Sequence, residues 1–403
     1  MGVYISLHAS NKIDPEQWEK AYEESLILVD KHEFIELQEF EKFDSKYIAA
    51  VKSAEHESSC GLGWKTVGDG IYMAMAEDFS LPRKIGSPKK DEKYCDPLMY
   101  ICAQQGVVDF ENPYVQGLRL FWHSKTQGEP YHIGLLAIGC LLDDRLNGEV
   151  LCGDDITYGQ CKQAVEIANK ILKKKIGMPL RCRIDDLYAR IRKLPIEKEN
   201  KLAAFSATYL GVKDEQYYKF VEEHFSDEEQ YLFFKKKMFE YRLESFGFSD
   251  CLKEVLSYNV SIARVCSIFM EMPPEKKMLE NGGNPFEEFI KEILDANIYL
   301  HEKDMRNCLS VNEESAETMS VEKLFAGFLF RSAWNRSVAR YIPLKKLKSQ
   351  LVEAFGNKCD VGKIIDEYLQ KKSEKQKNGN ACAQLNDLHD MVDKQLAVEQ
   401  KKL

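Results

Sequence analysis

Residues 132–146 have the sequence HIGLLAIGCLLDDRL and form the most apolar segment of the chain. A helix over this segment has no polar face in its middle, and a helix that is apolar all round is buried in a core. Asn147 and Gly148 follow it, and such a pair is typical of a helix end. We therefore expect a buried helix at 132–146.

The residues before this helix predict a sheet. Val3, Ile5 and Leu7 alternate with polar residues, as they do in a β-strand. A helix follows at Asp14 and Pro15, which suit its cap and its first position. Residues 34–43, 46–52 and 117–123 are expected to form further strands. In the segment 117–123, alternation is expected to place Leu118, Leu120 and Trp122 on one face of the strand. Arg119, Phe121 and His123 are then expected on the other face.

Glycine and proline punctuate residues 60–97, which predicts a long surface loop around a short helical piece at 71–78. Its first part runs from Gly61 to Gly70 and contains Lys65, a candidate phosphate contact. The spacing matches neither a Walker loop nor a dinucleotide fingerprint. We favour a hairpin or surface loop with Trp64 packed beneath it.

Beyond the buried helix, a short strand is expected at 149–152. Thr157 and Gln160 then fit a capping box that opens another helix. From residue 184 onward the pattern is almost wholly helical. We therefore predict an α+β, mainly helical protein, whose N-terminal α/β-like module with a mixed or antiparallel sheet precedes an irregular all-α helical array or bundle. The expected domains are 1–180 with the loop 60–97, 181–272, and 273–403 with a C-terminal helix at 381–402.

Composition narrows the classes of function. The chain has 403 residues, of which 44% are hydrophobic, and a formal net charge of −9. This acidic balance opposes non-specific binding to nucleic acid or to an anionic membrane. The 12 cysteines include no CxxC pair, which indicates free thiols in a reducing cytosol. No segment is apolar for long enough to span a bilayer, so we expect a soluble cytoplasmic protein without a membrane partner.

Acidic residues gather after the buried helix and are candidate ligands for a divalent metal such as Mg²⁺. Hard cations prefer carboxylate oxygens, and the metal set we predict is Asp144, Asp154 and Asp155. The competing interpretation is that these acids stabilise the start of a helix through its dipole.

His132 is the first candidate for acid–base catalysis, together with Asp154 and Asp155. It lies 11 residues before Asp143, a rise of about 16 Å on one helix, so those two side chains cannot share a metal ion. His8, His123 and Lys65 are candidate supporting residues if the strands bring them close. For each histidine alone, the competing role is structural.

Two basic segments, 170–193 and 331–348, are candidate nucleic-acid surfaces. Arg336 and Arg340 share a helix face, and Lys345 follows them. The alternative is that these residues form a solvent-exposed face, whose positive charge is balanced by acidic residues elsewhere in the fold.

Three functions remain open from the sequence. The favoured one is a binding or regulatory protein whose helical region recognises a protein partner. The second is a metal-dependent hydrolase that cleaves a phosphoester or nucleotide bond in the N-terminal module. The third is a nucleic-acid binder, which the net charge disfavours.

Overall fold

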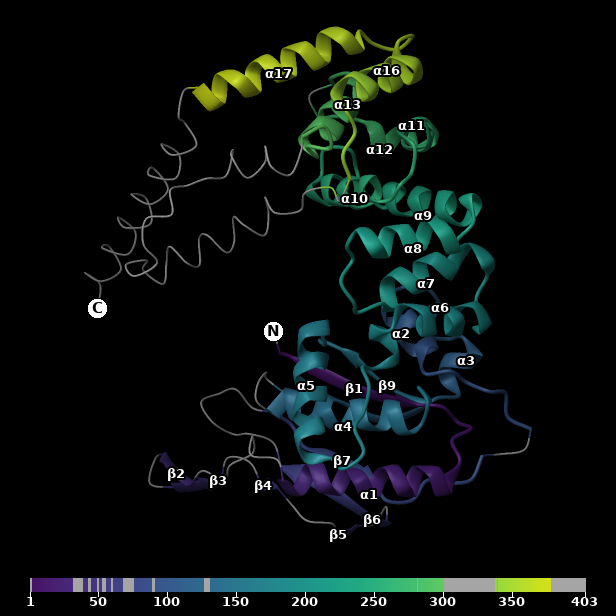
Figure 1. The fold of residues 1–403 in the computed structure, drawn as a ribbon, viewed down its shortest axis with the longest axis vertical. Coiled ribbons are helices and arrows are strands. Elements are labelled where there is room, and N and C mark those ends of the chain that lie inside the picture. The colour runs from purple at the N-terminus through teal and green to yellow at the C-terminus, as the bar shows by residue number, and fades with distance from the viewer. Residues whose placement is uncertain are drawn as a thin grey trace. The chain divides into compact units, whose positions relative to one another are not determined.

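A computed structural model describes residues 2–31, 39–42, 45–48, 51–52, 56–58, 61–67, 76–88, 91–126, 131–280, 282–300, 338 and 340–377. The protein is mainly helical α+β, with antiparallel sheets near its N-terminus and an array of helices after them (Figure 1). The chain divides into two compact units, Met1–Lys213 and Asp214–Leu403. The expected domain boundaries at 180 and 272 stay predictions, and the expected C-terminal helix at 381–402 lies outside the described residues.

The central sheet of the first unit has three antiparallel strands in the order β8-β1-β9. Their bounds are Arg119–Lys125 for β8, Tyr4–Ala9 for β1 and Val150–Asp154 for β9. Ile5 and Leu7 point into the core, so Ser6 and His8, which alternate with them, project from the opposite face of β1.

Helix α4 (Tyr131–Arg145) covers the core face of this sheet and confirms the predicted buried helix. It packs against β9, against α1 (Pro15–Lys31) and against α5 (Tyr158–Ile171), and it lies between the sheet and α1 (Figure 1). Gly139 makes the close approach possible, because a Cβ there would lie 2.1 Å from Cys152 Sγ. The predicted capping box of Thr157 and Gln160 opens α5.

A β-bulge changes which side chains of β8 face the core. Leu7 pairs with Trp122, but the next residue of β1, His8, pairs with Leu120. The extra residue, Phe121, packs against the core beside the buried Trp122, whereas Leu120 is 54% exposed. The strict alternation predicted from the sequence is therefore wrong here, because a bulge places two successive side chains on the same side.

Strands lie within the expected strand segments 34–43 and 46–52, and also within 60–97, where the sequence predicted a long loop that begins with a hairpin or surface loop. Strand β6 (Gly61–Val67) pairs with β4 (Val51–Lys52), β5 (His56–Ser58) and β7 (Phe79–Pro82), while β2 (Glu39–Lys42) pairs with β3 (Ser45–Ile48). Gly63 permits this pairing, since a Cβ there would lie 2.6 Å from Leu81 O. Trp64 is buried, as expected, and its indole donates to Ser25 Oγ.

Short helices complete the first unit. They are α2 (Leu98–Gln104), α3 (Pro113–Gln116), η2 (Leu180–Cys182), α6 (Ile184–Lys193), η3 (Lys198–Asn200) and α7 (Lys201–Thr208). Helix α2 contacts β9 and α7. Arg190 of α6 binds Asp96 and Glu149, which anchors α6 beside the start of α2 and the start of β9.

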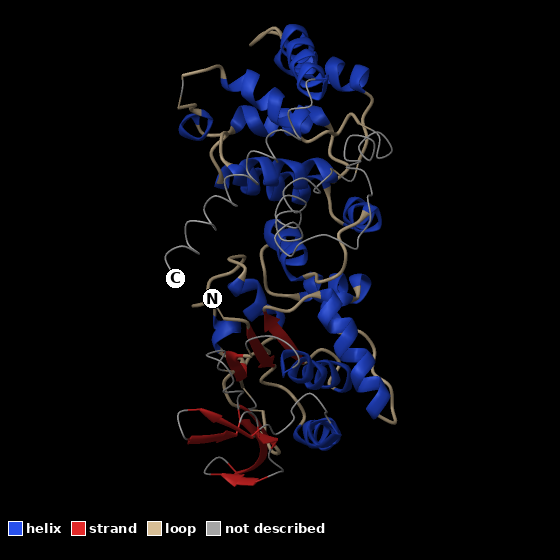
Figure 2. Ribbon diagram, turned by 90° about the vertical axis from the view of Figure 1, so that its left-hand side faces the viewer, coloured by secondary structure: helices blue, strands red, loops and turns tan. Residues whose placement is uncertain are grey.

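The described part of the second unit is all helical (Figure 2). Its helices are α8 (Glu215–His224), α9 (Asp227–Glu240), α10 (Phe246–Ser257), α11 (Ile262–Glu271), α12 (Pro274–Lys277), α13 (Pro285–Asp295), α16 (Leu344–Phe355) and α17 (Val361–Lys377). Phe269 stacks on Phe289 at 4.0 Å between ring centroids, and Phe355 meets both rings edge-on. Within the described residues, no helix combines the length and apolarity needed to cross a bilayer.

Candidate functional site

Polar side chains gather on the face of the central sheet that points away from α4. Ser6 pairs with His123 of β8 on one side and with Gly153 of β9 on the other. Paired residues of adjacent strands project from the same face, so strand register alone brings Ser6, His8 and His123 together.

Helix α2 contributes two further residues to this face. Gln104 Nε2 donates a hydrogen bond to Asp154 Oδ1, and the Tyr100 ring stacks on His8 with 3.6 Å between centroids. Gly153 leaves the necessary room, because a Cβ there would lie 2.6 Å from Ser6 Oγ and 3.1 Å from Gln104 Oε1. The sheet-face cluster consists of Ser6, His8, Gln104, His123 and Asp154.

Asp154 holds an unusual backbone conformation at the end of β9. Its φ is +66°, in the left-handed region that L-residues other than glycine rarely adopt. Asp155, the next residue, bonds back to Tyr4 through its amide and through a carboxylate oxygen 2.9 Å from the Tyr4 amide. Such strain costs of the order of 1 kcal/mol and persists where the surroundings enforce it, often at functional sites.

The two histidines of the cluster differ in environment. Burial and the nearby His123 lower the pKa of His8 to about 3, so its imidazole is neutral at physiological pH. The His123 side chain is 48% exposed, and its Nε2 lies 3.9 Å from Asp154 Oδ2. One histidine is therefore held without charge inside the cluster, while the other faces solvent next to a carboxylate.

Three buried polar atoms of the cluster lack a hydrogen-bond partner among the residues that the structure describes. They are Ser6 Oγ, His8 Nε2 and Asp154 Oδ2. Most buried polar atoms in folded proteins are paired, and each orphan costs about 1–3 kcal/mol. Their concentration on one face indicates a place that a polar ligand or ordered water completes.

The other predicted catalytic residues lie elsewhere. His132 is buried at the start of α4, with its Nδ1 2.8 Å from Thr126 Oγ1. Of the predicted and supporting residues, the structure brings together Asp154, His8 and His123; the side chain of Lys65 lies outside the described set.

The predicted metal ligands make separate contacts. Asp144 accepts from the Gly177 amide at 2.8 Å and pairs with Arg145. Asp155 is bonded to the start of β1, and Asp154 to Gln104. Across the described ranges, no three His, Cys, Asp or Glu side chains are arranged to hold a metal ion. A magnesium site here stays a prediction.

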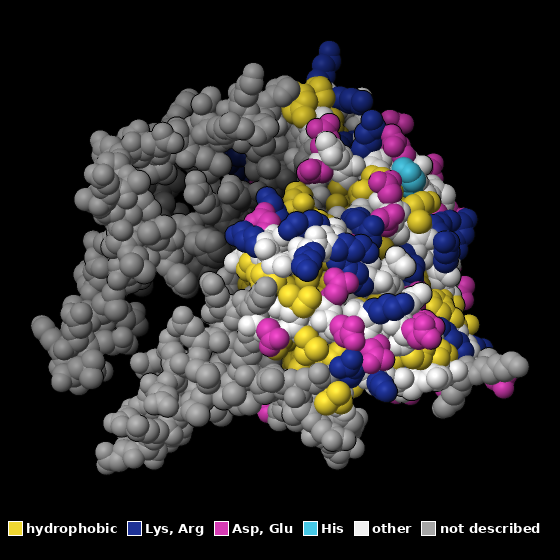
Figure 3. All heavy atoms as spheres, turned by 60° about the horizontal axis from the view of Figure 1, so that its bottom comes forward, with side chains coloured by type: hydrophobic (Ala, Val, Ile, Leu, Met, Phe, Trp, Pro, Cys, Tyr) yellow, Lys and Arg dark blue, Asp and Glu magenta, His cyan; other side chains and the backbone are white. Residues whose placement is uncertain are grey.

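Several basic side chains proposed to bind nucleic acid have partners inside the protein. Arg340 donates to the carbonyls of Tyr258 and Val260, and Lys345 is exposed on α16. Arg336 lies outside the described residues. In the described part of the face shown in Figure 3, acidic and basic side chains are interspersed. A nucleic-acid surface remains a prediction that this arrangement does not strengthen.

Sequence reasoning missed three residues of this face. Ser6 has a signal, because it shares the polar face of β1 with His8. For Tyr100 and Gln104 the sequence gives no such signal, since nothing in the sequence of α2 indicates that this helix packs against β9. Comparison with known proteins adds no assignment: no family model, no curated protein and no solved structure matches the chain.

Proposed function

We propose that the sheet-face cluster binds a small polar ligand and that His123 and Asp154 exchange a proton with it. The supporting observation is the set of three unpaired buried atoms beside a half-exposed histidine. A histidine next to a carboxylate is a common acid–base pair. This is the N-terminal enzyme hypothesis in a form that requires no metal ion.

The unpaired atoms define the chemistry of the ligand. A carboxylate oxygen accepts, so Asp154 Oδ2 requires an O–H or N–H group. Ser6 Oγ donates or accepts, and the neutral His8 ring offers Nε2 in one of these roles. We therefore expect a ligand with two or more hydroxyl or amino groups, such as a sugar, a nucleoside or an amino acid.

A panel of sugars, nucleosides and amino acids tests the proposal by ligand-observed NMR with the full-length protein. We expect at least one compound to bind wild type and to bind Asp154→Asn about tenfold more weakly, as loss of a charge-assisted hydrogen bond implies. Asp155→Asn is the matched control, because an asparagine oxygen still accepts from the Tyr4 amide. Equal binding to all three proteins would place the ligand elsewhere.

A second proposal concerns the helical unit and keeps the function that the sequence favours, a binding or regulatory protein that recognises a protein partner. Its support is an open pocket of about 490 Å³ between α8, α9 and α11. Glu222, Asp227 and Arg264 line it, and the Arg264 guanidinium lies 4.7 Å from the centre of the Tyr231 ring. Charges of both signs around an aromatic ring suit a polar protein segment better than a small apolar ligand.

Charge reversal at the pocket tests this second proposal. Proteins cross-linked to the full-length chain in its native host are compared for wild type, Arg264→Glu and Lys346→Glu, the last being an exposed position on α16. We expect Arg264→Glu to lose a partner that Lys346→Glu retains. Identical partners for all three proteins would contradict recognition by this pocket.

A further inference from the structure

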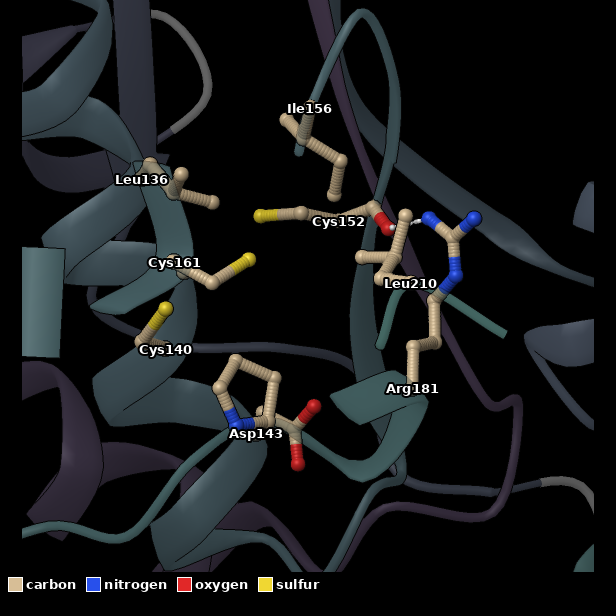
Figure 4. Close-up of a pocket in the computed structure, with 10 residues that line it drawn as sticks. Leu136, Cys140, Asp143, Cys152, Ile156, Cys161, Arg181 and Leu210 are labelled. Carbon is tan, nitrogen blue, oxygen red and sulfur yellow. Dashed lines mark hydrogen bonds between the residues drawn. The ribbon is translucent and has the colours of Figure 1, made fainter. Parts of the chain in front are cut away.

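Two cavities in the described part of the chain differ in what they can hold. The cavity of the first unit lies among the free thiols of Cys140, Cys152 and Cys161 (Figure 4), and its volume of about 10 Å³ is room for one water molecule. The pocket of the second unit, between α8, α9 and α11, has a volume of about 490 Å³, within the range of pockets that hold a whole small molecule. More than one side chain of a partner can therefore enter this second pocket together.

The positive charge of this second pocket is held on a fixed platform. The guanidinium carbon of Arg264 lies 4.7 Å from the centre of the Tyr231 ring. The Tyr231 hydroxyl donates to Glu271 of α11, and Glu271 pairs with Lys235 of α9 at 2.7 Å, so the ring is tied to both helices. A guanidinium stacked in this way keeps its N–H donors at its edge, where they can bind a carboxylate through two parallel hydrogen bonds.

The N–H donors of this guanidinium are available to a ligand. Among the residues that the structure describes, Arg264 makes no side-chain hydrogen bond and no ion pair, and only its backbone amide donates, to Ser261 Oγ at 3.2 Å. The charge of Arg264 reaches Glu271, but the two carboxylate oxygens of Glu271 already accept from Tyr231 and Lys235. An acidic group of a partner can therefore take the place beside Arg264.

Two acidic side chains line the same pocket and limit the charge of the ligand. Asp227 opens α9, and its carboxylate has no ion-pair partner within the described ranges. Glu222 accepts from Asn259 Nδ2 at 2.7 Å and is also within reach of the charge of Arg340, so Asp227 is the more available acid. Like charges placed together across an interface are costly, which disfavours a phosphoryl group with its charge of nearly −2.

We infer that the pocket recognises a protein segment that carries an acidic and a basic residue together. The acidic residue binds Arg264, and the basic residue binds Asp227 and Glu222. This inference rests on the second proposed function, recognition of a protein partner by the same pocket, and it adds the chemistry of that partner. A segment with acidic residues alone would face two carboxylates, and one with basic residues alone would face Arg264. Charge complementarity of this kind selects among partners more than it adds affinity.

Selection from a phage-displayed library of short random peptides tests the inference. Peptides are enriched on the full-length wild-type protein, and the binding of each is then measured to wild type, Arg264→Glu and Lys346→Glu. We expect peptides that bind wild type and Lys346→Glu equally, but bind Arg264→Glu at least about tenfold more weakly. These peptides should carry both an acidic and a basic residue, and replacing either one with alanine should weaken binding to wild type.

The outcomes separate this inference from the function on which it rests. Peptides that depend on Arg264 but are uncharged, or carry charges of one sign only, would overturn the inference and leave the pocket as a partner site. If no enriched peptide depends on Arg264, both the inference and recognition of a partner by this pocket are contradicted.

Two matched variants test the acidic side of the pocket. Asp227 and Glu215 are the first helical residues of α9 and α8, but only Asp227 lines the pocket. Reversal to lysine opposes the helix dipole equally at both positions. We expect Asp227→Lys to bind the selected peptides at least about tenfold more weakly than Glu215→Lys does, and to bind better when the basic residue of the peptide is replaced by glutamate. Equal binding by the two variants would overturn the inference; if Asp227→Lys fails to fold, Asp227→Asn should show a smaller loss in the same direction, and wild-type affinity there would be equally contradictory.

Discussion

Replacing His8 with phenylalanine should change how the stability of the first unit depends on pH. Burial and the neighbouring His123 lower the pKa of His8 from 6.5 to about 3. The unfolded chain takes up a proton at this imidazole below about pH 6.5, whereas the folded protein does so only near pH 3. Acid therefore favours the unfolded state between these values, and stability falls as the pH falls.

The size of the effect follows from the difference in pKa. One unit corresponds to about 1.4 kcal/mol, so protonation of the unfolded chain at His8 removes roughly 3 kcal/mol of stability between pH 7 and pH 4. A phenylalanine ring keeps the stack on Tyr100 but binds no proton, so this loss should disappear. Comparing both proteins at the same pH cancels the contributions of all other titrating groups.

Urea denaturation followed by tryptophan fluorescence measures the difference. Trp18, Trp64 and Trp122 are buried in the core of the first unit, and they are three of the four tryptophans in the chain. We expect His8→Phe to lose about 3 kcal/mol less than wild type when the pH is lowered from 7 to 4. Equal losses in the two proteins would refute a buried, neutral His8, even if the variant is less stable at both pH values.

Three further substitutions give independent checks. Burial raises the pKa of Asp143 from 3.8 to about 7, so between these pH values the folded state binds a proton that the unfolded state has lost, and stability falls as the pH rises. In urea denaturation, the stability of Asp143→Asn relative to wild type should therefore be a few kcal/mol higher at pH 8 than at pH 4. The same difference in stability at both pH values would contradict this. Gly153→Ala should cost about 1–3 kcal/mol through its contact with Ser6, whereas Gly159→Ala in α5, where a Cβ meets nothing within 4 Å, should be neutral or stabilising in the same assay. Phe269→Ala should destabilise the helical unit by about 3–5 kcal/mol, seen as faster amide-hydrogen exchange in α13 and α16; unchanged exchange would refute the role of the aromatic stack.

Local patterns in the sequence predicted the elements whose signals are local. The apolar run at 132–146 became α4, and the Thr157–Gln160 spacing became a capping box. For residues 61–70 the sequence left a hairpin and a surface loop open, and β7 was not predicted, because its pairing with β6 depends on the close approach at Gly63. A glycine-rich segment is predicted as a loop when the strands that pair with it are unknown.

The candidate site shows the same limit. Asp154, His8 and His123 were each candidates, but their convergence depends on which residues of β1, β8 and β9 are paired. His132 was the first candidate because it opens an apolar helix, yet in the structure it is buried at the start of α4 beside Thr126 Oγ1. Residue type and sequence spacing identify side chains that are able to act as acids, bases or ligands. The tertiary structure determines which of them lie close together.

Histidine footprinting tests the central claim, that the sheet-face cluster binds a polar ligand at His123. The protein is treated with diethyl pyrocarbonate in the presence of each compound of the sugar, nucleoside and amino acid panel, and modified histidines are quantified by mass spectrometry. His123 is 48% exposed at its side chain, so it should react in the free protein, and the exposed His224 serves as the internal reference. The account predicts that at least one compound slows modification of His123 and leaves His224 unchanged. Modification of His123 at the same rate with every compound would contradict it.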